Sequence, residues 1–259
     1  MGWVETNHSG ITFYQCRELN NRQVVQAFST RDSGNMALHI GDESDQVVAR
    51  RQSWLKALGL DLNQLVSSMQ VHGTKVALVE ETAAGSGASS LNGAIPDTDG
   101  LITNKPGFVL ATFTADCVPI FIYDPVTPAI AVVHAGWRGT IDGIATITLK
   151  SMVQKLSVIP GDCLVAIGPS ICGACYRVDQ QLADRFGAVH AQTVIKDESG
   201  FRVDLPAFNR LNLITAGVNP DHIFEAKLCT NCRADRLFSY RSDHGKTGRM
   251  MGIIALKGI

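Results

Sequence analysis

The stretch that decides the fold spans residues 108–140 and reads FVLATFTADCVPIFIYDPVTPAIAVVHAGWRGT. It holds three β-rich apolar runs, residues 108–114, 118–123 and 129–133, and Pro125 and Pro128 separate the last two. Short runs that are rich in Val, Ile and Phe and are bounded by turn residues are typical of buried strands. We therefore expect three strands here.

Outward from this stretch, strands and helices mix without strict alternation. Apolar patterning predicts further strands at 65–69 and 75–79, around a tight corner at 71–73, and at 164–167 and 253–256. It predicts helices at 46–58, capped by Ser44 and stopped by Gly59, and at 141–156, 179–186 and 206–216. The Ala-, Gly- and Ser-rich residues 82–92 indicate a mobile loop rather than a domain boundary. We expect one α/β (α+β) domain, residues 1–259, with a mixed sheet.

The composition is that of an ordinary globular protein, with 45% apolar residues, 18% charged residues and a net charge of −1. A near-neutral chain lacks the basic surface with which proteins bind nucleic acid or anionic membranes. The longest apolar run, 118–123, is far shorter than the roughly 18 residues of a membrane span, and the N-terminus has no signal-peptide pattern. We expect a cytoplasmic protein with no nucleic-acid or membrane partner.

The seven cysteines are an odd number in a chain without a secretion signal, which indicates reduced thiols. Four of them form two Cys-x-x-Cys pairs, Cys172 with Cys175 and Cys229 with Cys232. Zinc ribbons separate two such pairs by about 15–20 residues, whereas 53 residues intervene here. We therefore favour unligated buried thiols and keep a four-thiolate zinc site as the alternative.

Three segments each place a metal-binding side chain at a strand end or at a glycine turn. They are residues 70–74, 114–118 and 132–139, and the side chains are His72, Cys117 and His134. A rigid sheet presents side chains to a cleft at such places, and Gly73 and Gly136 let the backbone bend beside each histidine. Two imidazoles and one thiolate suit zinc, and three protein ligands leave the fourth position open, as in catalytic sites.

Several segments together resemble the laccase-domain family, also called the polyphenol oxidoreductase or YfiH-like family. They are residues 35–42, 70–73, 98–101, 115–119 and 134–139, the last of which reads HAGWRG. Residues 167–169 and the closing 238–250 resemble the C-terminal signatures of this family. The resemblance runs from about Asn35 to the C-terminus. Ser242 departs from it, because many members carry a second arginine there.

This resemblance implies a mixed-sheet sandwich with flanking helices, related to the catalytic domain of cytotoxic necrotizing factor. It also implies a zinc ion bound by His72, Cys117 and His134. Characterised members are purine nucleoside phosphorylases that also show adenosine deaminase activity. The expected partners are therefore phosphate and a purine nucleoside, namely inosine, adenosine or methylthioadenosine.

Two residues near the triad could take part in such a reaction. Asp116 could exchange a proton with the purine or act as a general base in deamination, or it could be a turn residue that hydrogen-bonds the backbone. Arg138 lies in a glycine-rich segment before the predicted helix, which favours phosphate binding, but it could equally be a structural arginine paired with a carboxylate. Trp137 could stack on a base or belong to the core.

Other chemistries remain open for the same residues. A multicopper oxidase needs many histidine ligands, commonly in His-x-His pairs, and this chain has seven histidines and no such pair. A single His₂Cys copper site is possible by ligand type, so a copper-dependent polyphenol oxidoreductase is one alternative. Without a metal, Cys117 and His134 would be a nucleophile–base dyad, which suits an amidase acting on peptidoglycan precursors. A non-enzymatic metal-binding or redox module is the third possibility.

Overall fold

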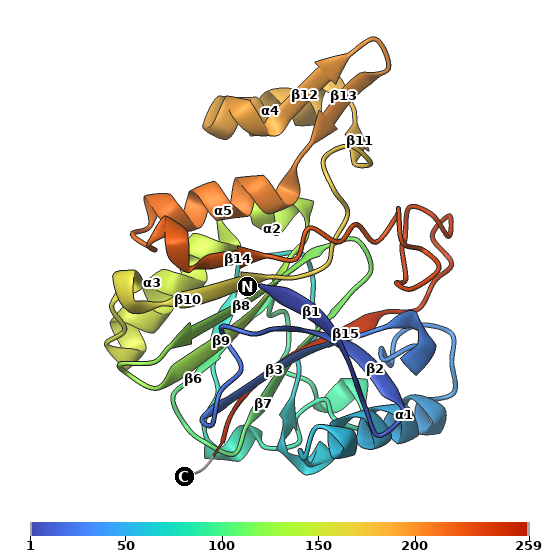
Figure 1. Ribbon diagram of the computed structural model, residues 1–259, viewed down its shortest axis with the longest axis vertical. Coiled ribbons are helices and arrows are strands. Elements are labelled where there is room, and N and C mark those ends of the chain that lie inside the picture. Colours follow the sequence, from blue (N-terminus) through green and yellow to red (C-terminus); the bar gives the residue numbers. More distant parts are fainter. Residues whose placement is uncertain (1, 258–259) are drawn as a thin grey trace.

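The computed structural model describes residues 2–257, so the ends of the expected 1–259 domain lie outside the described residues. Two six-stranded sheets lie face to face, and helices cover their outer surfaces (Figure 1). The strands of the first sheet are, in spatial order, β1 (Trp3–His8), β2 (Ile11–Cys16), β3 (Val24–Ser29), β15 (Met250–Leu256), β7 (Val109–Thr114) and β4 (Leu65–Val66).

The second sheet and the helices complete a mixed sandwich, as the sequence predicts. The second sheet has the order β14 (Ile223–Glu225), β10 (Leu164–Ile167), β8 (Val118–Asp124), β9 (Ala129–Ala135), β6 (Gly100–Thr103) and β5 (Val76–Leu78). Strand pairs β4–β7, β5–β6 and β10–β14 are parallel, and the other pairs in these two sheets are antiparallel. The helices are α1 (Ser44–Ala57), α2 (Trp137–Ile141), α3 (Ile144–Leu156), α4 (Gln180–His190) and α5 (Leu205–Thr215).

A small third sheet joins α4 in a unit that projects from the sandwich (Figure 1). Its strands are β11 (Arg177–Val178), β13 (Gly200–Val203) and β12 (Val194–Asp197). The fold class expected from the sequence is therefore confirmed. Its expected relation to cytotoxic necrotizing factor stays a prediction.

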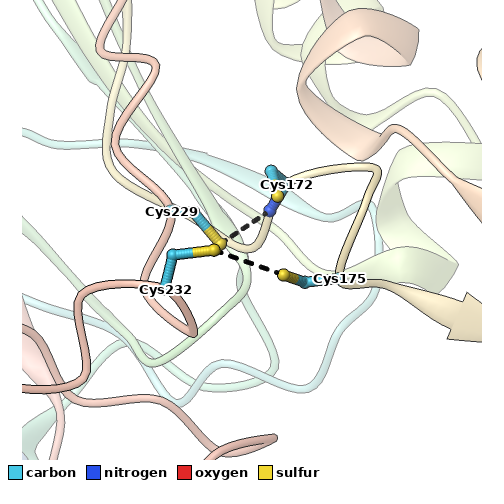
Figure 2. A group of neighbouring side chains, drawn as sticks. All are labelled: Cys172, Cys175, Cys229 and Cys232. Atoms are coloured by element: carbon cyan, nitrogen blue, oxygen red, sulfur yellow. Dashed lines mark hydrogen bonds between the residues drawn. The ribbon is translucent and has the colours of Figure 1, made fainter.

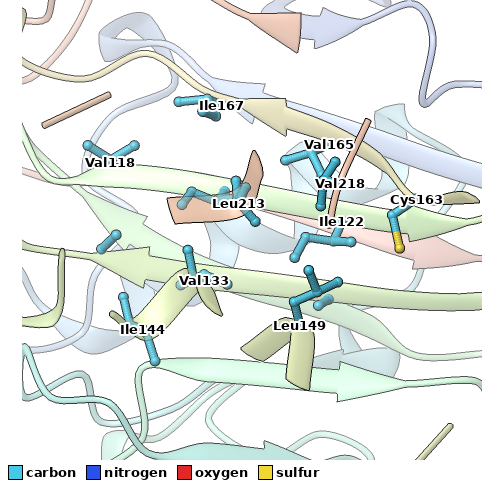
Figure 3. Packing of buried hydrophobic residues seen from close by; sticks show 14 of the residues in the cluster. Val118, Ile122, Val133, Ile144, Leu149, Cys163, Val165, Ile167, Leu213 and Val218 are labelled. Carbon is cyan, nitrogen blue, oxygen red and sulfur yellow. The ribbon is translucent and has the colours of Figure 1, made fainter. Parts of the chain in front are cut away.

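Strands β8 and β9 form continuous apolar runs because both of their faces are buried. Alternate residues such as Val133 face α3 and α5, and Figure 3 shows this packing around Ile144 and Leu213. The residues between them, such as Phe121, face the first sheet. The two sheets approach so closely that a Cβ added to Gly252 in β15 would lie 2.6 Å from Cζ of Phe121.

Several boundaries differ from the predicted ones. Strands β1, β2 and β3 were not predicted, and β15 begins at Met250 rather than at 253. The predicted 141–156 helix begins at Ile144, as α3, and a separate short helix, α2, precedes it, because Gly143 adopts a left-handed conformation (φ 81°) between the two. Arg138, expected in a segment before the helix, therefore lies inside α2. Ser44 is not the cap of α1 but its first residue, and Glu43 precedes it without a side-chain cap.

The segment 82–92 is more ordered than the expected mobile loop. It contains two short 3₁₀ turns, Glu81–Ala83 and Leu91–Gly93. Arg51 of α1 is buried and donates hydrogen bonds to the carbonyl oxygens of Gly87 and Ala88 at 2.7 and 2.8 Å. Arg51 also lies on the buried face of α1, between Val47 and Trp54. An apolar pattern alone would not predict an arginine at that position.

The chain crosses between the two sheets at one end of the sandwich. Strands β4 and β5, predicted as neighbours around the corner at 71–73, belong to different sheets, and so do β7 and β8. The connection between β4 and β5 and the connection between β7 and β8 therefore both bridge the sheets. The candidate functional site lies where these crossings meet the end of β9.

Candidate metal centre and its cavity

The three predicted ligands meet at this crossing. His72 lies between β4 and β5, Cys117 lies between β7 and β8, and His134 lies near the end of β9. Their ligand atoms all lie within 4.8 Å of one another. Cys117 Sγ is 3.8 Å from His72 Nε2, and the two imidazole rings stand edge to face with their centroids 4.7 Å apart. The structure thus brings the three side chains together as a candidate metal site.

Close packing holds His72 in place beside the start of α2. A Cβ added to Gly136 would lie 2.4 Å from His72 Cδ2 and 3.4 Å from Cys117 Sγ. Real Cβ atoms do not approach other heavy atoms that closely, so glycine is required here for a reason that is steric rather than conformational. His72 itself has a φ of 61°, which costs a non-glycine residue energy unless its surroundings fix it.

Asp99, directly before β6, supplies that fixation. One carboxylate oxygen accepts hydrogen bonds from the His72 backbone N–H at 3.0 Å and lies 2.8 Å from His134 Nδ1. The other accepts from the N–H groups of Val71 and Gly73, at 3.2 and 2.8 Å. A carboxylate behind a ligating histidine fixes the ring and its tautomer. Asp99 therefore orients both histidines, His134 through its ring and His72 through its backbone.

The protein groups of the site shift one another's pKa values. Burial favours the neutral forms, yet the pKa of Cys117 falls to about 6 because of the charge of His134 and hydrogen bonds from both histidines. Burial also opposes the charge on His134, but the Cys117 thiolate and the Asp99 carboxylate raise its pKa to about 9. The pKa of Asp99 is lowered, against the effect of burial, mainly by the hydrogen bond with His134. The site therefore favours the thiolate, which is the form that binds metals.

The triad lies on the wall of a cavity of about 510 Å³, a size that suits a small-molecule ligand. Arg138, Arg241 and Arg249 also line it. Among residues 2–257, no carboxylate lies within ion-pair distance of these three guanidinium groups. Burial lowers the pKa of Arg249, so its charge is partly desolvated. The cavity is therefore positively charged at several points and suited to an anion.

Asp116 lines the same cavity, next to Cys117. One of its carboxylate oxygens accepts a hydrogen bond from the Thr230 hydroxyl at 2.6 Å, and the other accepts from the Arg241 backbone N–H at 2.7 Å. Its own φ is 87°. Asp116 thus joins three segments that are distant in sequence, in the manner of a structural turn residue, and still faces the cavity.

Trp137 and Arg138, the remaining sequence candidates, both line the cavity. Trp137 packs against the helical side of the core, and the Arg138 guanidinium carbon lies 4.4 Å from its ring centroid. The positions of Asp99 and Tyr176 at the site were not predicted from the sequence. The only signal for Asp99 was its place in the 98–101 segment of the family resemblance.

Within residues 2–257, no helix is both long enough and apolar enough to cross a bilayer.

The sandwich and the His₂Cys cluster define the class of protein, a mixed α/β fold with a candidate metal site beside a cationic cavity. A family model described as multi-copper polyphenol oxidoreductase laccase matches residues 20–257, and the chain belongs to this family.

Named relatives and a solved structure cover nearly the whole chain. The chain is 35% identical to purine nucleoside phosphorylase YlmD of Bacillus subtilis (strain 168), over 98% of this chain and 92% of that protein. It is 32% identical to adenosine deaminase RL5 from an unknown prokaryotic organism, over 87% and 91% of the two chains. The crystal structure of YlmD from Geobacillus stearothermophilus superimposes with a TM-score of 0.92, at 32% identity, over 98% and 99% of the two chains.

Proposed function

We propose that this protein is a zinc-dependent purine nucleoside phosphorylase that also deaminates adenosine, with inosine, adenosine and methylthioadenosine as substrates. The observation that carries the proposal is the meeting of a three-ligand metal site and three arginines in one cavity, the arginines having no carboxylate partner in the described part of the chain. The names of the relatives support the same activities. The proposal includes one catalytic domain over residues 1–259 and a cytoplasmic location.

The ligand set fits zinc. Tetrahedral zinc with Zn–S near 2.3 Å and Zn–N near 2.05 Å would hold a sulfur and a nitrogen about 3.6 Å apart. Cys117 Sγ and His72 Nε2 are 3.8 Å apart, and His134 is backed by Asp99 as ligating histidines usually are. Zinc bound by His72, Cys117 and His134 would supply Lewis acidity on the wall of the cavity. Copper is the alternative metal for the same donors.

The arginines are proposed to bind and orient phosphate. Phosphorolysis forms a bond between a phosphate oxygen and C1′ of the ribose and breaks the bond between C1′ and N9 of the purine. Arg138 is exposed at the cavity and carries no carboxylate partner among residues 2–257, so its guanidinium is available for bidentate contact with phosphate. Holding the anion beside the ribose supplies the proximity that a bimolecular reaction needs.

Asp116 is proposed to exchange a proton with the purine, and to act as the general base for water in deamination. Its hydrogen bonds from Thr230 and Arg241 hold the carboxylate in one orientation at the cavity. Tyr176 also lines the cavity, and burial raises its pKa to about 12. Its hydroxyl therefore stays protonated at neutral pH.

The test is a product analysis with metal-defined protein. Zinc-loaded, copper-loaded and metal-stripped protein would be assayed with inosine and adenosine, each with and without phosphate, and with a phenolic substrate in air. The proposal expects hypoxanthine and ribose 1-phosphate from inosine only when phosphate and zinc are both present. It expects inosine from adenosine without phosphate. Oxidation of the phenol without any nucleoside turnover would overturn it in favour of the copper oxidoreductase.

A second candidate function, acyl transfer by Cys117, has one specific observation in its favour. His134 lies between Cys117 and Asp99, which is the order of a nucleophile, a base and an orienting carboxylate. An amidase of this kind would work with the thiolate free of metal. Hydrolysis of peptidoglycan-type amides that rises when zinc is stripped would favour this candidate, and loss of nucleoside turnover on stripping would favour zinc catalysis.

A further inference from the structure

The two Cys-x-x-Cys pairs, distant in sequence, lie side by side in the fold. Ser170 and Cys229 form a parallel β-bridge. In this bridge the Ser170 N–H donates to the Leu228 carbonyl oxygen at 3.2 Å, and the Thr230 N–H donates to the Ser170 carbonyl oxygen at 3.1 Å. This short backbone register sets the segment before Cys172 against the segment that holds Cys229.

Each pair then lies on a tight turn. The Cys175 N–H donates to the Cys172 carbonyl oxygen at 2.9 Å, and the Arg233 N–H donates to the Cys229 carbonyl oxygen at 3.0 Å. Turns of this kind bring the sulfurs of a Cys-x-x-Cys pair to the same side of the backbone. In Figure 2 the four cysteine side chains point toward one another.

The distances between the sulfurs match one metal ion. All four Sγ atoms lie within 4.8 Å of one another, and those of Cys175 and Cys232 are 3.4 Å apart. Four sulfurs around zinc at about 2.3 Å form a tetrahedron with edges of about 3.8 Å. A disulfide bond needs sulfurs about 2.05 Å apart, and all four cysteines are free thiols.

The backbone also supports a bound thiolate. The Cys172 N–H points at Cys229 Sγ across a distance of 3.4 Å, drawn as a dashed line in Figure 2. Cys229 is buried, Cys172 and Cys175 are half-buried, and Cys232 is exposed. Such N–H contacts offset part of the negative charge that four thiolates bring.

We propose that Cys172, Cys175, Cys229 and Cys232 bind one structural zinc ion, separate from the metal site at His72, Cys117 and His134. Zinc is the expected metal because its structural sites are typically closed, tetrahedral and formed by four cysteines. This reverses the sequence-based preference for unligated thiols. The long gap of 53 residues between the pairs is spanned by the fold.

The cluster is linked to the wall of the cavity by direct contacts. The Ile171 N–H donates to the Asp116 carbonyl oxygen at 3.0 Å, and the Thr230 hydroxyl donates to the Asp116 carboxylate. The Arg241 guanidinium donates to the Cys175 carbonyl oxygen at 3.2 Å. Zinc in the cluster would therefore fix the positions of Ile171, Tyr176 and Arg241, which line the cavity.

The experiment counts zinc in variants that separate the two sites. Protein purified under reducing conditions and loaded with zinc would be analysed for metal per chain. The proposal expects two zinc ions in the wild type, one in Cys117→Ala, one in Cys232→Ser and two in the control Cys163→Ser, which removes a buried thiol outside both clusters. Cys232 is the exposed member of the cluster, so its replacement by serine perturbs packing least.

Two further measurements test the proposal if the Cys232→Ser variant fails to fold. In Cys117→Ala, whose only zinc would be in the cluster, a chelator should lower the melting temperature, and zinc should restore it. Thiol titration of that folded variant should find the four cluster cysteines protected by zinc and reactive after chelation. No zinc in Cys117→Ala, four reactive thiols in the zinc-loaded protein, or disulfides in place of metal would each overturn the proposal. None of these readouts depends on nucleoside turnover, so failure of the proposed function leaves the result unaffected.

Discussion

Replacement of Asp99 by asparagine tests how the metal site is built. Asparagine keeps the shape of the side chain and can still accept a hydrogen bond from His134 Nδ1. Its amide nitrogen cannot accept from the backbone N–H groups of Val71 and Gly73, which now donate to a carboxylate oxygen at 3.2 and 2.8 Å. The substitution therefore removes the charge behind His134 and the contacts that hold the corner carrying His72.

The size of the effect follows from these lost contacts. Loss of the carboxylate partner of a ligating histidine lowers metal affinity by roughly ten- to a hundredfold, which corresponds to about 1.4–2.7 kcal/mol. Each hydrogen bond to a charged group contributes on the order of 1.5–3 kcal/mol to stability. Two such bonds are lost, and relaxation of the loop reduces the cost. We therefore expect the free energy of unfolding to fall by about 3 kcal/mol, the lower end of the sum for two bonds.

The assay is a zinc competition titration against a chromophoric chelator, at a temperature where circular dichroism shows the variant folded. Asp124→Asn is the control for loss of a buried carboxylate, because Asp124 is also buried and lies at the opposite end of β8 from Cys117. One of its carboxylate oxygens accepts both backbone N–H groups, from Val126 and Thr127. Its asparagine oxygen can still accept both bonds, so this variant should lose less stability than Asp99→Asn and should keep the zinc affinity of the wild type. Unchanged zinc affinity in folded Asp99→Asn, or an equal loss in both variants, would refute the positioning role of Asp99.

Three other predictions concern the same cavity. Gly136→Ala should abolish zinc binding at the His72–Cys117–His134 site in a folded protein, because its Cβ would lie 2.4 Å from His72 Cδ2; full zinc occupancy of this site would contradict this. Arg138→Ala should slow phosphorolysis by on the order of 1.5–3 kcal/mol, or roughly ten- to more than a hundredfold, and slow adenosine deamination less, with zinc retained; equal losses would make Arg138 a general substrate-binding residue. In zinc-stripped protein, alkylation of Cys117 by iodoacetamide should reach half its maximal rate near pH 6 and level off above that pH, because only the thiolate reacts and its pKa is about 6; a rise that continues toward pH 9 would show an ordinary thiol.

Much of the fold was predictable because its central strands are buried on both faces. Strands β8, β9 and β10 consist of continuous apolar runs with turn residues at their ends, so local composition alone defines them. The β1–β2 hairpin escaped prediction because β1 is polar and half exposed, with only the Ser9–Gly10 turn as a signal. The assignment of neighbouring strands to different sheets cannot be read from a local pattern.

The candidate site, too, could be predicted from the sequence only in part. His72, Cys117 and His134 could be found because each belongs to a residue type that binds metals and lies beside a glycine turn or at a strand end. Asp99 could not, because its role depends on a register that sets the start of β6 opposite the end of β9. The spacing of the four cysteines along the chain argues against a shared site, but the bridge between Ser170 and Cys229 brings the two pairs together in space.

The most direct test of the central claim is inosine phosphorolysis by protein that has been stripped of metal and reloaded with zinc. Ribose 1-phosphate formation would be followed in the wild type and in Cys117→Ala, with zinc content measured on the same samples. We predict that activity is absent after stripping, returns in proportion to occupancy of the His72–Cys117–His134 site, and stays absent in Cys117→Ala. Full activity in the stripped protein, or in Cys117→Ala, would contradict the account.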